Sequence, residues 1–165
     1  MKRYLTLVAL VVGQLALVAF AVAPQLSART TGDEFTFRVQ PIDPIEPGRG
    51  RYVQLGYPDL QDPRADWIEP GTLGTIEDGE NGDLYVVIGE QDGVWVADRM
   101  TRTRPDSGTF MKCRAQWQIR CGIESLFVNE NRAPKLEDDL ADGAYATVRI
   151  DPRGNASVVD IREDL

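Results

Sequence analysis

The chain begins with a long apolar run that contrasts with everything after it. The segment Tyr4 to Ala23 (YLTLVALVVGQLALVAFAVA) contains no charged residue. At about 1.5 Å per residue, a helix of this length spans the roughly 30 Å hydrocarbon core of a bilayer. Lys2 and Arg3 precede the run, so the positive-inside rule places the N-terminus in the cytoplasm and the rest of the chain outside. The pattern therefore predicts a single N-terminal transmembrane anchor over residues 1–23.

A cleaved signal peptide is the competing interpretation of the same run. Ala21-Val22-Ala23 has the small residues of a cleavage site, but Pro24 directly after the cut disfavours cleavage. The run is also longer than the roughly 7–15 apolar residues of a typical signal peptide. No cysteine follows it directly, so a lipid-modified N-terminus is not expected. The anchor is favoured over cleavage, and the soluble part is exported in both cases.

After a polar tether at residues 24–33, apolar and polar residues alternate with the two-residue period of half-buried strands. Phe35, Phe37 and Val39 form the first alternating set. The prolines in segment 41–47 make a stiff connector before the next strand, because proline lacks the backbone N–H that a central strand needs. The predicted strand segments are 34–39, 50–57, 83–90, 94–101, 109–115, 118–121, 123–128, 144–150 and 156–161.

Turn residues between these segments indicate antiparallel hairpins. The dipeptide Asp92-Gly93 joins two strongly alternating segments, and residues 151–155 join the last two. One short helix is predicted at 134–142, between the first-turn proline and a capping glycine at position 143. The predicted fold class is mainly β. It is an antiparallel sandwich or partly open barrel with one short helix, occupying residues 34–165 and preceded by a single transmembrane helix.

Charge narrows the range of partners. The formal net charge of the whole chain is −8, and all of its acidic residues lie beyond Ala23 together with all but two of the basic ones. Binding to a nucleic-acid backbone requires a basic surface, so DNA and RNA are not expected as partners. The acidic balance also predicts repulsion between the exported domain and the anionic headgroups of its own membrane.

The two cysteines, Cys113 and Cys121, predict a disulfide. An even cysteine count in an exported protein favours a bridge. Along one continuous strand the pair would be too far apart to bond, but a chain reversal around residues 116–118 would bring them face to face across a hairpin. Two buried free thiols are the alternative.

Catalytic chemistry has few candidates in this sequence. The chain has no histidine, which removes Ser-His-Asp and Cys-His systems and histidine metal sites. A serine with a lysine base is the remaining option, with Ser125 and either Lys112 or Lys135 as the pair. The acidic residues of 137–142 lack the spacing of a calcium loop and fit a solvated helix face better. We therefore expect no enzymatic activity, no cofactor and no metal, and the residues leave the question of a small-molecule ligand open.

Two sequence blocks resemble the GDYXXLXY family. The first, GRYVQLGY, has Arg51 where the family usually has aspartate, and it matches the named positions at Gly50, Tyr52, Leu55 and Tyr57. The second, GIESLFVNE, is similar to the family pattern G-I-E-x-x-F-V-P-E, with Asn129 in place of proline. Its matching residues are Gly122, Ile123, Glu124, Phe127, Val128 and Glu130.

The resemblance implies a small bacterial protein held in the inner membrane by one N-terminal helix, with its domain facing the periplasm. It also implies genomic proximity to multi-span membrane proteins, but it carries over no catalytic residue. From the predicted anchor, the absence of histidine and the absence of a convincing nucleophile or metal cluster, we expect a non-enzymatic accessory or interaction subunit of an integral membrane protein. The alternatives are an exported hydrolase using the Ser/Lys pair and a ligand-sensing module built around an apolar pocket.

Overall fold

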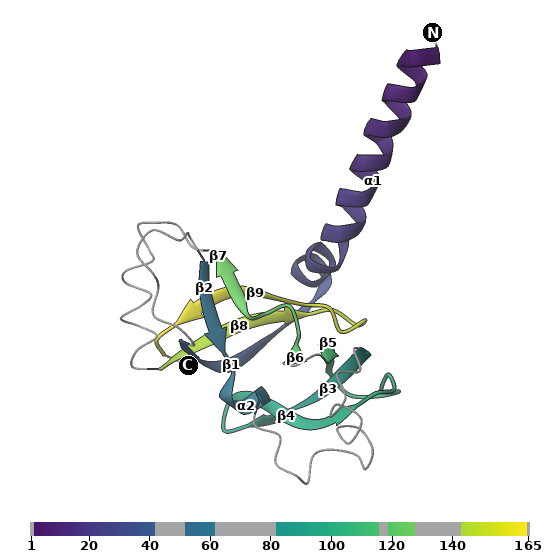
Figure 1. Ribbon diagram of the computed structural model, residues 1–165. Helices are drawn as coiled ribbons and strands as arrows, with labels where there is room; N and C mark the ends of the chain where they lie inside the picture. The colour runs from purple at the N-terminus through teal and green to yellow at the C-terminus, as the bar shows by residue number, and fades with distance from the viewer. Residues whose placement is uncertain (1, 42–51, 62–81, 116–118, 128–142, 165) are drawn as a thin grey trace.

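The computed structural model describes residues 2–41, 52–61, 82–115, 119–127 and 143–164. It confirms the predicted fold class, with a mainly β domain of two antiparallel sheets preceded by one long apolar helix (Figure 1). In chain order the elements are α1 (Lys2–Thr31), β1 (Asp33–Pro41), β2 (Tyr52–Gly56), α2 (Pro58–Gln61), β3 (Gly82–Gln91), β4 (Val94–Thr101), β5 (Phe110–Ala115), β6 (Ile119–Arg120), β7 (Ser125–Phe127), β8 (Ala144–Ile150) and β9 (Ala156–Arg162).

The first sheet joins the two ends of the chain. Its strand order is β7-β2-β1-β8-β9, and every neighbouring pair is antiparallel. The central strand β1 pairs with β8 along most of its length, from Asp33 opposite Ile150 to Val39 opposite Ala144. The first strand after the helix is thus held in place by a strand from the end of the chain.

The second sheet has the order β4-β3-β5-β6 and is built from the middle of the chain. Its β3–β4 hairpin turns at the predicted dipeptide, with φ values of 52° at Asp92 and 82° at Gly93. Two successive left-handed residues form the turn whose twist matches that of antiparallel strands, and Asp and Gly adopt this conformation readily. The Asp-Gly turn signal in the sequence is therefore confirmed.

The hydrophobic core lies between the two sheets and is formed by the inward positions of the alternating segments. Phe37, Leu55 and Leu84, from three different strands, are each at most 1% exposed. Full burial of a side chain of this size contributes about 1.5–3 kcal/mol. The sheets also meet through an edge-to-face contact between the rings of Phe35 and Trp95, whose centroids lie 4.9 Å apart.

The β8–β9 hairpin also ties the first sheet to the second. Its tip contains Gly154, whose carbonyl accepts a hydrogen bond of 2.7 Å from the backbone N–H of Lys112 in β5. Gly154 has a φ of 87°, and a Cβ at this position would lie 2.7 Å from the ring of Phe110. Both the backbone conformation and the close approach therefore require glycine here.

Helix α1 extends further than the sequence pattern suggested. The segment 24–33 was expected to be a polar tether, but it is helical as far as Thr31. Pro24 lies inside the helix, where it cannot donate the usual backbone hydrogen bond, and α1 bends near the domain in Figure 1. The apolar part projects away from the sheets, whereas the last turns pack against β8 and β9.

The two short helical segments differ from expectation. The helix predicted at 134–142 lies outside the described residues. The four-residue helix α2, Pro58–Gln61, was not expected. It begins with a proline, which is well suited to the first helical position, and Asp59 lies in its first turn.

Candidate functional site

The two sequence blocks of the resemblance pair with each other in the folded protein. Strand β2 carries the first block and β7 the second, and they form an antiparallel ladder that places Tyr52 opposite Phe127. The backbone N–H of Leu55 continues this contact by donating a 2.9 Å hydrogen bond to the carbonyl of Glu124. Two stretches far apart in the sequence thus form one structural unit at the edge of the first sheet.

Tyr57 connects this unit to the core. Its hydroxyl donates a 2.9 Å hydrogen bond to the carbonyl of Ile123, and both side chains are buried. The ring also lies edge-on to Phe37, with centroids 6.2 Å apart. Burial, and to a smaller extent the negative charge of Glu124, raise the pKa of Tyr57 well above its ordinary value. The phenol therefore stays protonated and keeps donating.

Glu124 closes a tight turn ahead of β7. Its carboxylate accepts hydrogen bonds from the backbone N–H groups of Cys121 and Gly122, the latter at 3.0 Å. Gly122 has a φ of 82°, a left-handed conformation that favours glycine. The Gly and Glu of the second block are accordingly structural residues that shape the turn between β6 and β7.

The predicted disulfide between Cys113 and Cys121 is confirmed. The two Cα atoms lie 4.0 Å apart across the β5–β6 hairpin. The bond links Cys113, which is buried in the core, to the turn that Glu124 organises. The predicted geometry is thus confirmed, with the bridge facing across a hairpin whose tip, 116–118, lies outside the described residues.

The last turns of α1 are fastened to the domain by polar side chains. Gln25 donates a 3.3 Å hydrogen bond to the carbonyl of Gly122 in the motif turn. Ser27 donates a 2.5 Å hydrogen bond to the carboxylate of Asp151, and the Arg29 guanidinium donates one of 3.0 Å to the Ser157 hydroxyl. The helix base therefore contacts both the second sequence block and the β8–β9 hairpin.

Asp151 accepts several hydrogen bonds at this junction. It is 3% exposed, and its carboxylate accepts hydrogen bonds from Ser27, from the side chain and backbone of Asn155, and from the backbone of Arg153. Burial alone would raise the pKa of Asp151, but these hydrogen bonds outweigh it and hold the pKa below its ordinary value. The charged form of Asp151 is thus bound into the fold.

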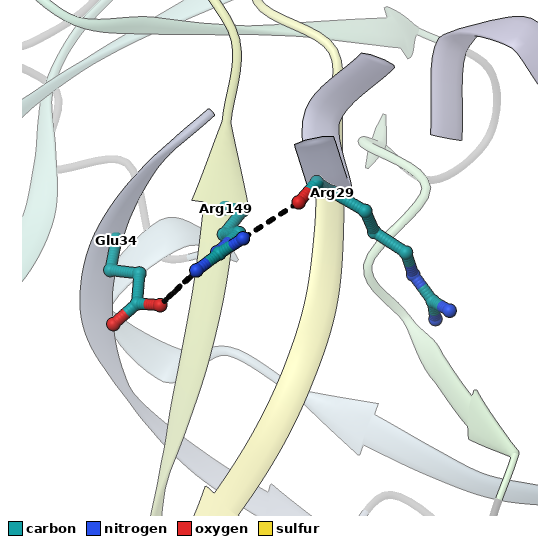
Figure 2. A network of polar contacts seen from close by, with 3 residues as sticks. All are labelled: Arg29, Glu34 and Arg149. Carbon is teal, nitrogen blue, oxygen red and sulfur yellow. Dashed lines mark hydrogen bonds and ion pairs between the residues drawn. The ribbon is translucent and has the colours of Figure 1, made fainter. Parts of the chain in front are cut away.

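An exposed network completes the junction (Figure 2). The guanidinium of Arg149 on β8 donates a 2.7 Å hydrogen bond to the carbonyl of Arg29, near the end of α1. The same group pairs with the Glu34 carboxylate on β1 at 2.7 Å. Gly32 follows the helix directly, and a Cβ there would lie 2.4 Å from the carbonyl oxygen of Ala28. The helix end is thus held by charge-assisted hydrogen bonds and by close backbone packing.

Some of the residues singled out in the sequence cannot be placed in this site. Gly50, Arg51, Val128 and Glu130 lie outside the described residues, and only the backbones of Tyr52 and Phe127 are described. The junction residues gave no sequence signal of their own. Asp151 and Arg149 occur in a turn and on a strand, where a charged residue usually faces water, and their partners at the helix base are more than one hundred residues away.

The Ser/Lys pair gains no support from the geometry. Ser125 is exposed on β7 in the first sheet, whereas Lys112 lies on β5 in the second and pairs with Asp83 at 2.9 Å. The hydrogen bond to Asp83 raises the pKa of Lys112, while a lysine general base requires a lowered one. Lys135 lies outside the described residues. In the parts of the chain that the structure covers, no group of three or more His, Cys, Asp or Glu residues could hold a metal ion.

The profile of the GDYXXLXY protein family matches residues 14–161, which is most of the chain. The chain belongs to the GDYXXLXY family. The match begins inside α1 and continues through both paired blocks into β9, so the helix base and the β domain both fall within what the family shares. No curated protein and no solved structure matches the chain. In this GDYXXLXY protein, the described motif residues therefore have structural roles that were not evident from the family pattern.

Proposed function

We propose that this GDYXXLXY protein is a single-span membrane protein whose β domain lies outside the cytoplasm and serves as a non-enzymatic accessory subunit of an integral membrane protein. One observation carries the proposal. A helix that is apolar and fully exposed in its first part continues without interruption into a part that is bound to the domain by side-chain hydrogen bonds.

The exposed part of α1 has the character of a membrane span. Within Thr6–Thr31, the most apolar stretch of 18 residues has a mean hydropathy of 2.4, and none of that stretch is buried by the protein. Leu7, Leu15 and Phe20 are 60%, 64% and 82% exposed. An apolar surface of this extent is unfavourable in water and favourable in a bilayer, which supports the anchor.

The connection between helix and domain is fixed, and a fixed connection supports an accessory role better than a flexible tether would. A flexible linker would let the domain sample many positions above the membrane. Here the contacts of Gln25, Ser27 and Arg29 fix the domain on the helix end, so the orientation of one determines that of the other. A fixed orientation suits a domain that must present a particular face to a membrane-embedded partner.

Co-purification tests the proposal directly. The tagged full chain would be extracted from its own membranes in a mild detergent, and the co-purifying proteins identified by mass spectrometry. We expect an integral membrane protein to be enriched. A matched control replaces residues 4–23 with a Leu/Ala helix of the same length and keeps the contacts of Pro24 to Thr31. Loss of the partner in the control would assign recognition to the helix, and retention would assign it to the domain.

Two outcomes would contradict the proposal. Recovery of the wild-type chain without any membrane protein would argue against the accessory role. A purified protein that starts at Pro24 and is released from membranes by washing would argue against the anchor. Protease accessibility in spheroplasts tests the orientation, because we expect the β domain to be digested only from the outer side of the membrane.

A further inference from the structure

An open groove lies beside the base of α1. It has a volume of about 460 Å³ and lies between the last turns of the helix, the disulfide hairpin β5–β6 and the start of β9. Pro24 and Gln25 contribute the helix side. Lys112, Arg114 and Arg120 contribute the hairpin side, and Asp83 is the acidic residue among those that line the groove. The groove is therefore locally basic in a chain whose net charge is −8.

Two of these basic residues face each other across the β5–β6 hairpin. Arg114 and Arg120 are directly opposite in the β5–β6 pair. Like charges at opposite positions of an antiparallel pair destabilise it. Asp83 lies opposite Arg114 in the β3–β5 pair, but its carboxylate forms its ion pair with Lys112, at 2.9 Å, so one acidic residue faces three basic ones among the residues that line the groove. Cys113 directly precedes Arg114 and Cys121 directly follows Arg120, so the disulfide bond holds the two arginines close together despite their repulsion.

The residues that line the groove show where it lies along α1. Pro24 and Gln25 immediately follow the apolar segment that ends at Ala23. If the apolar segment spans the bilayer, the groove lies at the level of the headgroups on the outer side. The attraction between a basic residue and an anionic membrane surface falls off within a Debye length, so it requires such proximity.

We propose that this groove binds a phosphate group, presented by the headgroup of an anionic phospholipid. Opposed guanidinium groups supply paired N–H donors that match the oxygens of a phosphate, and the anion removes the repulsion between them. The position beside the lipid boundary rests on the membrane anchoring of the proposed function. The net charge of the domain predicted repulsion from anionic headgroups, but the arrangement of charge around α1 favours attraction at this one place.

Lipid binding by the full chain in non-ionic detergent tests the proposal. Native mass spectrometry would measure the retention of phosphatidylglycerol and, as a comparison, phosphatidylcholine. We expect the wild-type chain to retain phosphatidylglycerol preferentially and the double variant Arg114→Gln/Arg120→Gln to bind it about tenfold more weakly, because charge-assisted hydrogen bonds are lost. The double variant Arg38→Gln/Arg162→Gln is the matched control, since it removes the same charge from residues outside the groove lining.

Inorganic phosphate distinguishes a lipid headgroup from free phosphate as the source of the ligand. Millimolar phosphate that leaves phosphatidylglycerol retention unchanged would support the lipid headgroup. Phosphate that binds with the same arginine dependence, while phosphatidylglycerol does not bind, would overturn the headgroup and assign the groove to free phosphate. Equal phosphatidylglycerol retention by the wild type and both double variants would overturn the site itself.

The disulfide provides a second measurement. Reduction, or the substitution Cys113→Ser/Cys121→Ser, removes the bond that holds the arginines opposite each other, so retention of phosphatidylglycerol should fall while the control lipid is unaffected. Circular dichroism shows whether the domain remains folded. Failure of the anchor would appear separately, as a chain that begins at Pro24 and washes off membranes, and the phosphate titration still tests the groove in that case.

Discussion

The two parts of α1 belong to one continuous helix but have opposite relations to the rest of the protein. In the first part, Leu15 and Phe20 are 64% and 82% exposed, so the β domain does not bury them. In the second part, Ala28 is completely buried and Ser27 and Arg29 bind residues of the last hairpin. The comparison shows that two parts of one continuous helix can have side chains in different environments. The side chains alone divide the helix into an exposed apolar part and a part that packs against the β domain.

The substitution Leu15→Lys should have the largest effect and should act on the first part only. A charge at the centre of a membrane helix costs about 2.5–3.5 kcal/mol on insertion scales. We expect a clear loss of the protein from the membrane fraction, measured by carbonate extraction and immunoblotting. Leu15→Ile is the control and should remain membrane-bound. Unfolding of the detergent-solubilised domain should be the same in all three proteins, and a change there would contradict the separation of the two parts.

The substitution Asp151→Asn should destabilise the second part and leave membrane insertion intact. It replaces a buried carboxylate that accepts four hydrogen bonds, and each hydrogen bond to a charged group contributes about 1.5–3 kcal/mol. We expect the free energy of unfolding, measured in urea, to fall by about 2 kcal/mol. Faster hydrogen exchange at the amide of Gly32, which bonds the Ala28 carbonyl, should accompany it.

Asp98 on β4 is an exposed aspartate and provides the control for this experiment. Asp98→Asn should change the free energy of unfolding by less than about 0.5 kcal/mol. Unchanged exchange at Gly32 in the Asp151 variant would mean that the helix base does not depend on this carboxylate.

Acid should weaken the same junction. The pKa of Asp151 is lowered in the folded protein relative to its ordinary value of 3.8, so the charged form contributes stability above that pH. The contribution is lost as the pH falls from the ordinary value through the lower pKa of the folded state. The difference in unfolding free energy between wild type and Asp151→Asn should therefore be constant near neutrality and shrink below about pH 4. A difference that stays constant into this acid range would show that the charge of Asp151 is not involved.

The substitution Tyr57→Phe should affect the β domain without loosening the helix. It removes the hydrogen bond to the Ile123 carbonyl and leaves a buried acceptor unpaired, at a cost of about 1–2 kcal/mol. We expect a lower midpoint in urea unfolding but unchanged hydrogen exchange at Gly32. Tyr145→Phe, at a half-buried position on β8, is a control for removal of a phenol hydroxyl. Faster exchange at Gly32 in the Tyr57 variant would show that the paired motif blocks also support the helix base.

The smallest effect is expected from Arg149→Gln. The pair with Glu34 is exposed, and such ion pairs contribute about 0.2–1 kcal/mol. Most of the effect should therefore come from the hydrogen bond to the carbonyl of Arg29 and should appear as local fraying of the helix end. Arg162→Gln, which removes another exposed ion pair on β9, is the control. Equal exchange rates at residues 29–32 in both variants would show that the Arg149 bridge does not secure the helix end.

Sequence patterns predicted the local features of this protein but not the contacts between residues that are far apart in the sequence. Alternation identified the strands because burial of one sheet face repeats every two residues, and the Asp-Gly dipeptide identified its hairpin because that turn requires left-handed residues. The disulfide followed from symmetry about a local reversal. The family pattern identified two blocks, but only the structure revealed that they pair with each other in space.

The helix base shows why the remainder could not be predicted. Gln25, Ser27 and Arg29 resemble a polar tether because their partners lie about one hundred residues or more away in the chain. The same limit applies to the basic groove. Net charge is a sum over the chain, whereas the opposition of Arg114 and Arg120 depends on the register of the β5–β6 hairpin.

The pairing of β1 with β8 has a consequence for how the protein is made. Chains are synthesised from the N-terminus, so the central strand of the first sheet exists long before its main partner does. The helix base must wait as well, because Asp151 and Ser157 belong to the final hairpin. Until β8 and β9 have emerged, the nascent domain has an unpaired sheet edge and a helix end without its hydrogen-bond partners. Assembly of the first sheet is therefore completed by β8 and β9, and a chain that stalls before β8 would be left with one edge of β1 open to other partners.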